Sequence, residues 1–384
     1  MSDKYWALLG NWSFIQEQEK GMTIYEYDAE NGMLTEKETI LPDLYAGMQY
    51  FDPNRDIDYV VNEIAHRRGE SGGGGYVVAL KLDRRTGSLT LVNEKESLAP
   101  EPSYLYGDKS GKYLFVVHHI DSGHVTKISK VDGKYQSETF FDDAAAVLFE
   151  IKEDGSLGDA CDVQIVKGLD PVGIHAIPHL HSVVADPSGE LYTVCDKGLD
   201  RIYTYRIDRE NGKLVPVSVT VTPDGTSPRY LTYHPTLPLV YVNFEKCTDL
   251  YVYRYDTENG IGDLVTTLQL LEDEKSAEGV QRVEASDILV TDDAKHLYVC
   301  IRGVNLIAVM DLDEDGLPTL VQNVGCQGDP RGITLAPDGR YMFSCNMMAG
   351  TISTFQVRED GTLQFRDNNV KGVNPANILF VKAE

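Results

Sequence analysis

The feature of this sequence that most constrains its fold is a hairpin signal that recurs along the whole chain. An Asn-Gly or Asp-Gly pair follows a run in which apolar and polar residues alternate, as in 202–208 and 250–256. Such pairs accept positive φ angles and favour hairpin turns, while a period of two is typical of a strand with one buried face. The pairs are Asn31-Gly32, Asp154-Gly155, Asn211-Gly212, Asn259-Gly260, Asp315-Gly316 and Asp360-Gly361, with Thr86-Gly87 as a variant.

A second pattern recurs between these hairpins: an extended segment, a turn and then an apolar strand, as at 181–194 and 330–343. Together the two patterns make units of four antiparallel strands, roughly 45–70 residues long, which indicates propeller blades. The first strands of six units are expected to begin near Tyr45, Pro102, His179, Pro228, Ala285 and Pro330.

A seventh first strand, at 375–381, has no further strand after it. Its missing partners are found at the other end of the chain, at 5–10, 22–28 and 34–39. We therefore predict an all-β, seven-bladed β-propeller that spans residues 1–384 as a single domain. Its last blade is completed by both termini, which removes open sheet edges. The insertions at 66–75 and 120–145 are predicted to be surface loops.

Composition limits the partners of the chain. Lys and Arg number 35 against 60 Asp and Glu, and the net charge of −25 disfavours nucleic acid and an anionic membrane surface as partners. No basic segment followed by an apolar one opens the sequence, and no apolar run reaches about 18 residues. The six cysteines are dispersed without a C-x-x-C pair, which indicates reduced thiols. These features predict a cytoplasmic protein.

Polar residues gather where the first and second strands of each blade meet. In an antiparallel hairpin the start of one strand lies beside the end of the next, so these side chains are expected to face one funnel near the propeller axis. Because arginine matches carboxylate and phosphate groups, three arginines in this set predict a small anionic substrate. The set is Asn62, Glu63, His118, His119, His179, His181, Asp196, Arg229, Glu245, Arg302 and Arg331.

Cofactors are not expected at this funnel. His179 and His181, and likewise His118 and His119, are candidate metal ligands, but no suitably spaced third ligand accompanies them. The glycine-rich segment 72–75 follows no strand–helix pattern, so it does not indicate a phosphate loop. We predict that activity requires no metal, flavin or nicotinamide.

The clearest family resemblance lies in the segment Pro178-His179-Leu180-His181-Ser182, followed by Asp186-Pro187-Ser188-Gly189. It resembles the Pro-His-x-His-Ser…Asp-Pro-x-Gly signature of the seven-bladed-propeller lactonases. That family includes the propeller type of 6-phosphogluconolactonase and the carboxy-muconate lactonizing enzyme. The resemblance covers the whole chain, and further matching segments are 196–202, 227–229, 302–303 and 329–331.

The resemblance also implies the site residues. It places the active-site quartet of the family on His181, Arg229, Glu245 and Arg302, and we expect further substrate contacts from Glu63, His118, His119, His179 and Arg331. Three neighbouring positions depart from the family pattern, namely Phe244, Ile301 and the pair His118-His119. The substrate can therefore differ from 6-phosphogluconolactone.

The activity implied by the resemblance is hydrolysis or formation of a lactone of an anionic sugar or organic acid, in the manner of 6-phosphogluconolactonase. Either His181 or Glu245 is a candidate base, with the arginines holding the anion. The alternative enzyme is a muconate-type cycloisomerase. The alternative without chemistry is a propeller that serves as a binding platform, although the Trp-Asp pairs of WD-type repeats are absent. The sequence leaves the oligomeric state open.

Overall fold

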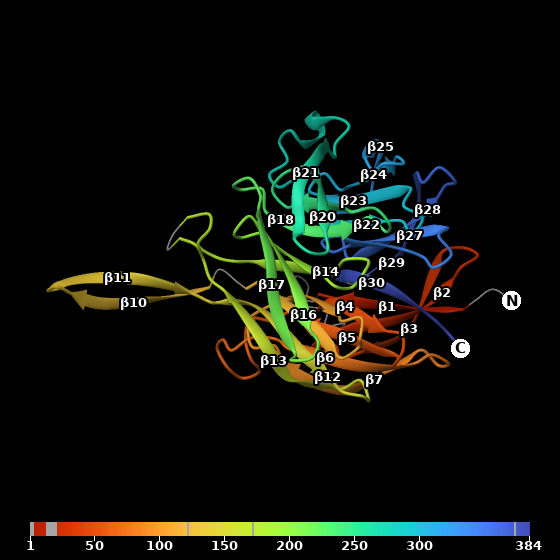
Figure 1. Cartoon of the computed structure of the whole chain (residues 1–384). Coiled ribbons are helices and arrows are strands. Elements are labelled where there is room, and N and C mark those ends of the chain that lie inside the picture. Colours follow the sequence, from red (N-terminus) through yellow and green to blue (C-terminus); the bar gives the residue numbers. More distant parts are fainter. Residues whose placement is uncertain (1–3, 13–20, 121–122, 171–172, 372–373) are drawn as a thin grey trace.

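The computed structural model describes residues 4–12, 21–120, 123–170, 173–371 and 374–384. Within these residues the strands form seven four-stranded antiparallel sheets and one separate two-stranded sheet (Figure 1). The innermost strands of consecutive sheets lie against each other, and the innermost strand of the seventh lies against that of the first. The sheets are therefore the blades of a closed seven-bladed propeller, as predicted.

The first three blades hold the N-terminal half of the ring. They comprise β4 (Ala46–Asp52), β5 (Ile57–Asn62), β6 (Tyr76–Asp83) and β7 (Ser88–Glu96); then β8 (Pro102–Gly107), β9 (Tyr113–His118), β12 (Ala144–Ile151) and β13 (Leu157–Val166); and then β14 (Leu180–Ala185), β15 (Tyr192–Asp196), β16 (Arg201–Asp208) and β17 (Lys213–Val221).

The next three blades follow in the same order, and in all six the first strand begins within one residue of its predicted position. They comprise β18 (Pro228–Tyr233), β19 (Leu239–Phe244), β20 (Asp249–Asp256) and β21 (Gly260–Gln269); then β22 (Glu284–Val290), β23 (His296–Arg302), β24 (Leu306–Leu312) and β25 (Pro318–Gly325); and then β26 (Pro330–Leu335), β27 (Tyr341–Asn346), β28 (Thr351–Val357) and β29 (Leu363–Lys371).

The seventh blade joins the two ends of the chain. Its strands are β30 (Pro375–Lys382), β1 (Tyr5–Asn11), β2 (Met22–Asp28) and β3 (Met33–Ile40), in that order across the sheet. β1 pairs with β30 so that Leu8 lies opposite Leu379, and it pairs with β2 along its other edge. β1 and β30 lie side by side in Figure 1, and beyond them the backbone N–H of Ala383 donates to the carbonyl of Lys4 at 2.9 Å. The predicted split blade is confirmed.

The recurrent Asp-Gly turns also join neighbouring blades. Tyr59 on β5 donates a hydrogen bond to the carbonyl of Gly155, in the outer turn of the second blade, at 2.8 Å. The same contact recurs from Tyr241 to Gly316 (2.7 Å) and from Tyr298 to Gly361 (2.8 Å). All three glycines have positive φ, between 74° and 83°. The turn therefore ends one hairpin and at the same time anchors its blade to the blade before it.

The two insertions differ from each other. Residues 66–75 form a loop with a single bridge between His66 and Gly73, as predicted. The prediction of a loop at 120–145 is wrong for most of its length, because β10 (His124–Val131) and β11 (Lys134–Phe141) form a hairpin. The helix η1 (Glu274–Ala277) is a single short turn. Among the described residues, no helix is long and apolar enough to cross a membrane.

Candidate active site

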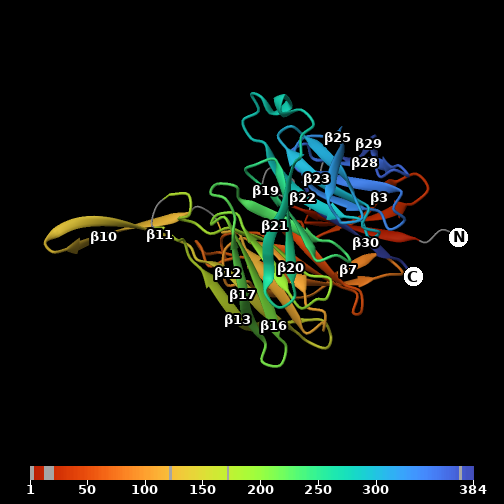
Figure 2. The same ribbon diagram turned by 45° about the horizontal axis from the view of Figure 1, so that its top comes forward.

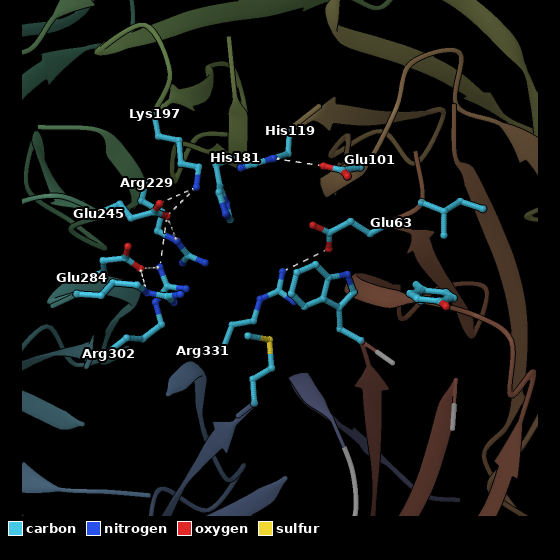
Figure 3. A pocket seen from close by; sticks show the side chains of 15 residues that line it. Glu63, Glu101, His119, His181, Lys197, Arg229, Glu245, Glu284, Arg302 and Arg331 are labelled. Atoms are coloured by element: carbon cyan, nitrogen blue, oxygen red, sulfur yellow. Dashed lines mark hydrogen bonds and ion pairs between the residues drawn. The ribbon is translucent and has the colours of Figure 1, made fainter. Parts of the chain in front are cut away.

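A cavity of about 510 Å³ opens where the innermost strands begin and the second strands end (Figure 3). Five cationic side chains and four carboxylates line it, together with two histidines, two aromatic residues and two aliphatic ones. The lining residues are Trp12, Tyr45, Glu63, Ile64, Glu101, His119, His181, Lys197, Arg229, Glu245, Arg282, Glu284, Arg302, Arg331 and Met347. The predicted funnel is therefore a charged cavity in which cations slightly outnumber carboxylates.

Seven of these lining residues occupy the same position in their blades, at the end of the second strand. In six blades it is the residue that directly follows the second strand, and in the fifth blade it is the last residue of that strand. In ring order from the seventh blade, these residues are Trp12, Glu63, His119, Lys197, Glu245, Arg302 and Met347.

Three further lining residues come from β-bulges. His181, Arg229 and Arg331 are each the second residue of an innermost strand, namely β14, β18 and β26. In each blade the pairing with the second strand shifts register across that residue. A bulge leaves one residue out of the ladder and re-aims its side chain. The bulges thus orient the imidazole of His181 and the guanidinium groups of Arg229 and Arg331 toward the cavity.

Glu245 is the centre of the charged cluster on one side of the cavity (Figure 3). Lys197 Nζ lies 2.7 and 2.9 Å from its two carboxylate oxygens. Arg229 Nε lies 3.1 Å and Arg302 Nη2 3.3 Å from Oε2. Arg302 also contacts Glu284 at 2.7 Å, and a lining arginine outside the predicted set, Arg282, meets the same oxygen at 2.7 Å.

These contacts determine the ionisation of the cluster. Burial alone would raise the pKa of Glu245, but Lys197, Arg229 and Arg302 together hold it well below its usual value. Burial lowers the pKa of the Lys197 ammonium, an effect that Glu245 opposes. Burial and the nearby Arg229 lower the pKa of Arg302 to about 10. The carboxylate of Glu245 is therefore ionised near neutral pH and is a weak base.

His181 lies between the charged cluster and the opposite wall, with its ring pointing into the cavity (Figure 3). The ring packs edge-on against Tyr230 and His119, each with centroids 5.3 Å apart. Burial, followed by the positive charges of Arg229 and Lys197, lowers the pKa of His181 well below its usual value. Its Nδ1 is buried without a hydrogen-bond partner among the described residues. The imidazole is therefore neutral near pH 7.

The opposite wall pairs one carboxylate with one guanidinium. Arg331 Nη2 lies 3.3 Å from Glu63 Oε2, and the Arg331 guanidinium stacks on the Trp12 ring at 4.7 Å from its centroid. Burial raises the pKa of Glu63, although Arg331 opposes the effect. A Cβ at Gly47 would lie 1.9 Å from the Glu63 carboxylate, so glycine at that position makes room for it. An aromatic face and a guanidinium thus lie side by side on this wall.

Two predicted contact residues lie outside the cavity. His118 is fully buried and donates from Nδ1 to the carbonyl of Ala145 at 2.8 Å, and burial lowers its pKa to about 4. His179 donates from Nδ1 to the carbonyl of His119 at 2.7 Å, and its ring stacks on the His119 ring with centroids 4.5 Å apart. Of the pair 118–119, only His119 reaches the cavity, where its Nδ1 lies 3.4 Å from Glu101.

Two polar residues of the predicted funnel have structural roles instead. Asp196 is fully buried and accepts backbone hydrogen bonds from His179, Gly198 and Leu199 at 2.8–3.1 Å. It therefore holds the turn that presents Lys197. Asn62 accepts a hydrogen bond from the backbone of Tyr45 at 3.0 Å. Each ties the end of a second strand to the start of the first.

Lys197 is the most important residue that the sequence analysis did not assign to the site. It stands within the family-like run 196–202, and it follows the second strand of its blade as Glu63 and Glu245 do. This equivalent position in the blade was the sequence signal that could have identified Lys197 as a cavity residue. Trp12 and Met347 follow the same rule, whereas Glu101 and Glu284 come from the start of the first strand.

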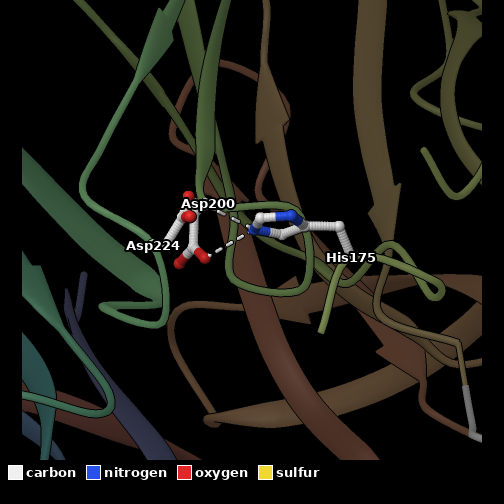
Figure 4. A group of neighbouring side chains, drawn as sticks. All are labelled: His175, Asp200 and Asp224. Atoms are coloured by element: carbon white, nitrogen blue, oxygen red, sulfur yellow. Dashed lines mark hydrogen bonds and ion pairs between the residues drawn. The ribbon is translucent and has the colours of Figure 1, made fainter. Parts of the chain in front are cut away.

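A possible metal-ligand group lies on the rim between the third and fourth blades (Figure 4). Three atoms that could bind a metal lie within 4.8 Å of one another, one each from His175, Asp200 and Asp224. His175 Nε2 contacts Asp200 at 2.9 Å, but the same carboxylate also accepts the backbone N–H groups of Gly225 and Ser227, both at 2.7 Å. These contacts join two blades, so the group has a structural explanation, and the prediction that activity needs no metal stays a prediction.

Comparison with known proteins gives consistent matches. The family model described as "Lactonase, 7-bladed beta-propeller" matches residues 13–380. The 6-phosphogluconolactonase of Bacillus subtilis (strain 168) is 23% identical over 98% of this chain and 99% of its own. That of Enterobacter sp. (strain 638) is 25% identical over 79% and 81%. The structure of the periplasmic gluconolactonase of Pseudomonas aeruginosa superimposes with a TM-score of 0.82 at 21% identity, covering 99% of this chain and all of its own.

Proposed function

The chain belongs to the seven-bladed β-propeller lactonase family, and from that premise we propose that it hydrolyses the lactone of an anionic sugar or organic acid, 6-phosphogluconolactone first among them. The observation that carries this proposal is a neutral imidazole, His181, pointing into a cavity beside Lys197, Arg229 and Arg302. A neutral base next to a group of fixed cations suits the attack of water on the carbonyl of an anionic substrate.

Hydrolysis in this cavity needs one proton to move and one negative charge to be stabilised. Water attacks the lactone carbonyl carbon while His181 takes its proton, and the carbonyl oxygen becomes an oxyanion beside the arginines. The tetrahedral intermediate then collapses, and the bond from the carbonyl carbon to the ring oxygen breaks. The ring oxygen takes the proton back from His181, which leaves a carboxylate and a hydroxyl group after the acid loses its proton to solvent.

His181 is a better candidate base than Glu245. Three cations within 3.3 Å stabilise the ionised form of Glu245 and so weaken it as a base. The pKa of His181 is also low in the free protein, but part of the cause is the positive charge of Arg229 and Lys197. An anionic substrate that neutralises this charge raises the pKa of His181 toward its ordinary value of 6.5. Binding of the substrate thus activates the histidine and leaves Glu245 as a counter-ion.

The opposite wall suits the polyhydroxylated part of a sugar lactone. An aromatic face such as that of Trp12 packs against the apolar face of a sugar ring, and the carboxyl group of Glu63 accepts or donates hydrogen bonds to hydroxyl groups. Arg331, stacked on Trp12, adds a cation for a phosphate or carboxylate at this end. The curated relatives named above are 6-phosphogluconolactonases, which supports a phosphorylated sugar lactone as the first substrate to test.

The experiment follows acid release in a pH-stat, since lactone hydrolysis consumes water and yields a carboxylic acid. We expect 6-phosphogluconolactone to be hydrolysed faster than gluconolactone and than a muconolactone, after subtraction of the spontaneous rate. Replacing His181 by Ala should lower kcat by about 10²–10⁴-fold. The matched control is His66→Ala, in an exposed loop outside the cavity, which should leave kcat unchanged.

Other outcomes would each redirect the proposal. Loss of dienoate absorbance with a muconate, without acid release from any lactone, would make the protein a cycloisomerase. No activity on either class would favour the binding platform. If His181→Ala keeps its kcat while Glu245→Gln loses it, the glutamate is the base and the histidine assignment is wrong.

A further inference from the structure

The hairpin of β10 and β11 is built unlike the rest of the described chain. It forms a two-stranded sheet of its own that pairs with no blade, and it projects away from the propeller in both Figure 1 and Figure 2. Nearly all of its residues are exposed, including Val125 at 59%, Ile128 at 77% and Tyr135 at 77%. An isolated two-stranded hairpin is at best marginally stable in water. Apolar side chains on such a hairpin therefore indicate a surface that another molecule covers.

The hairpin is regular, so its free edges are suited to pairing. Asp132 and Gly133 form its two-residue turn with φ of 52° and 81°, the combination that a tight type I′ turn requires. Every residue from 124 to 131 pairs with one from 134 to 141 without a bulge. The outer edge of β10 consequently presents a straight row of backbone donors and acceptors, which is a template for a further strand.

We propose that this further strand is β10 of a second copy of the chain, paired antiparallel about a two-fold axis at Ile128. In that register Ile128 lies opposite Ile128 of the second copy, and Val125 lies opposite Val131. Lys127 falls opposite Ser129, and no like charges are directly opposed. Because directly opposed residues share a face of the sheet, the valine pairs form on one face and the isoleucine pair on the other.

The other edge of the hairpin opposes like charges when its aromatic ends are aligned. Aligning the aromatic ends of β11, so that Tyr135 lies opposite Phe141, places Glu138 opposite Glu138 of the second copy. Like charges directly opposed across strands are destabilising. The register that aligns the aromatic ends of β11 is therefore disfavoured, and we assign the pairing to β10, which gives a closed two-fold dimer rather than an open array.

The position of the hairpin also fits a dimer. Eight residues per strand span about 27 Å at 3.4 Å per residue, and antiparallel pairing puts the two propellers at opposite ends of a continuous four-stranded sheet. Each hairpin tip then approaches the propeller of the other copy. The hairpin carries three lysines against two carboxylates, so two hairpins can meet without the repulsion expected from the acidic excess of the whole chain, whose net charge is −25.

The first test measures the mass of the full chain in solution by sedimentation velocity over a range of concentrations. We expect a dimer that Ile128→Lys weakens by about tenfold or more in dissociation constant, because it removes an apolar pair and opposes two charges at the axis. The matched control is Ser137→Lys, which adds the same charge to the same face one strand further from the axis. It should change the dissociation constant by less than about twofold, and lactone hydrolysis should be unaffected in both variants.

A second test reads the register itself. Residues opposed across antiparallel strands lie within the distance that a disulfide spans. Ile128→Cys should therefore form a disulfide-linked dimer on mild oxidation, beyond any background seen for the unsubstituted chain, whereas Ser137→Cys should not. A monomeric chain at tens of micromolar, or a dimer that withstands Ile128→Lys, would overturn the proposal. Cross-linking through position 137 in place of 128 would overturn the assignment of the pairing edge.

Discussion

Removing the charge of Glu245 should destabilise the protein mainly by leaving Lys197 unpaired. Arg229 keeps a hydrogen bond to the carbonyl of Ser286 at 2.7 Å, and Arg302 keeps its contact with Glu284. Glu245 is the only carboxylate within ion-pair distance of Lys197 among the described residues, and the side chains of the two are 15% and 12% exposed. Breaking a buried pair from one side costs about 3–5 kcal/mol. We expect Glu245→Gln to lower the free energy of unfolding by an amount in this range.

The ionisation of Lys197 sets an upper limit to this loss. A lysine of ordinary pKa, about 10.4, becomes neutral at pH 7 at a cost of about 4.6 kcal/mol, so the unpaired amine releases its proton before the penalty grows further. The unfolded state then binds more protons than the folded state, and the stability of the variant should rise from about pH 7 to about pH 10. Lys197→Met on its own should cost less, because Glu245 retains two arginines.

The assay is a double-mutant cycle in urea unfolding. The variant that combines Glu245→Gln with Lys197→Met should recover about 1–3 kcal/mol relative to the sum of the single changes, and it should lack the rise in stability at alkaline pH. The matched control is the surface pair of Lys109 and Glu190, whose side chains are 46% and 43% exposed. Its cycle should give less than about 1 kcal/mol. Additive effects at Lys197 and Glu245, with unchanged m-values, would refute the assignment of Glu245 as the counter-ion of a buried lysine.

Three further outcomes follow from the structure. Activity should fall at low pH as His181 gains a proton. Because the bound anion raises the pKa of His181, the acidic limb of the kcat profile should lie at higher pH than the acidic limb of the kcat/KM profile. Acidic limbs at the same pH would contradict this effect of the bound anion. Deleting 375–384 should prevent folding, as judged by circular dichroism, since β30 is the inner strand of the seventh blade. Arg331→Gln should raise KM more for the phosphorylated lactone than for gluconolactone, and equal changes would place the phosphate elsewhere.

The blade order was predictable because it depends on local chemistry. Asx-Gly pairs specify turns through their φ angles, and a lone strand at 375–381 needs partners that only the N-terminus supplies. The hairpin at 124–141 was missed although it contains the same signal, Asp132-Gly133. Its strands have no buried face, so the alternation by which the other strands are recognised is weak there.

Most of the cavity was also predictable, but the direction of individual side chains was not. His118 and His119 are adjacent in sequence, yet one points into the blade and the other into the cavity. The strand period alone would not decide between them, because the bulge in the neighbouring strand changes which residue faces the axis. Lys197 was missed for a related reason. Its partner, Glu245, belongs to the next blade, so the sequence signal that remained was its position directly after the second strand.

The acidic composition and the cationic cavity act at different length scales. A net charge of −25 describes the field far from the protein, and at physiological ionic strength that field is screened over about 8 Å. Inside the cavity the low dielectric strengthens each contact, and there five cations face four carboxylates. The net positive charge of the cavity is small because Glu245 and Glu284 neutralise nearby cations. Their ion pairs also hold Arg229 and Arg302 in place without a substrate. A large polyanion meets the negative surface first, whereas a molecule small enough to enter meets the cations, so net charge and cavity together support the proposal of a small anionic substrate.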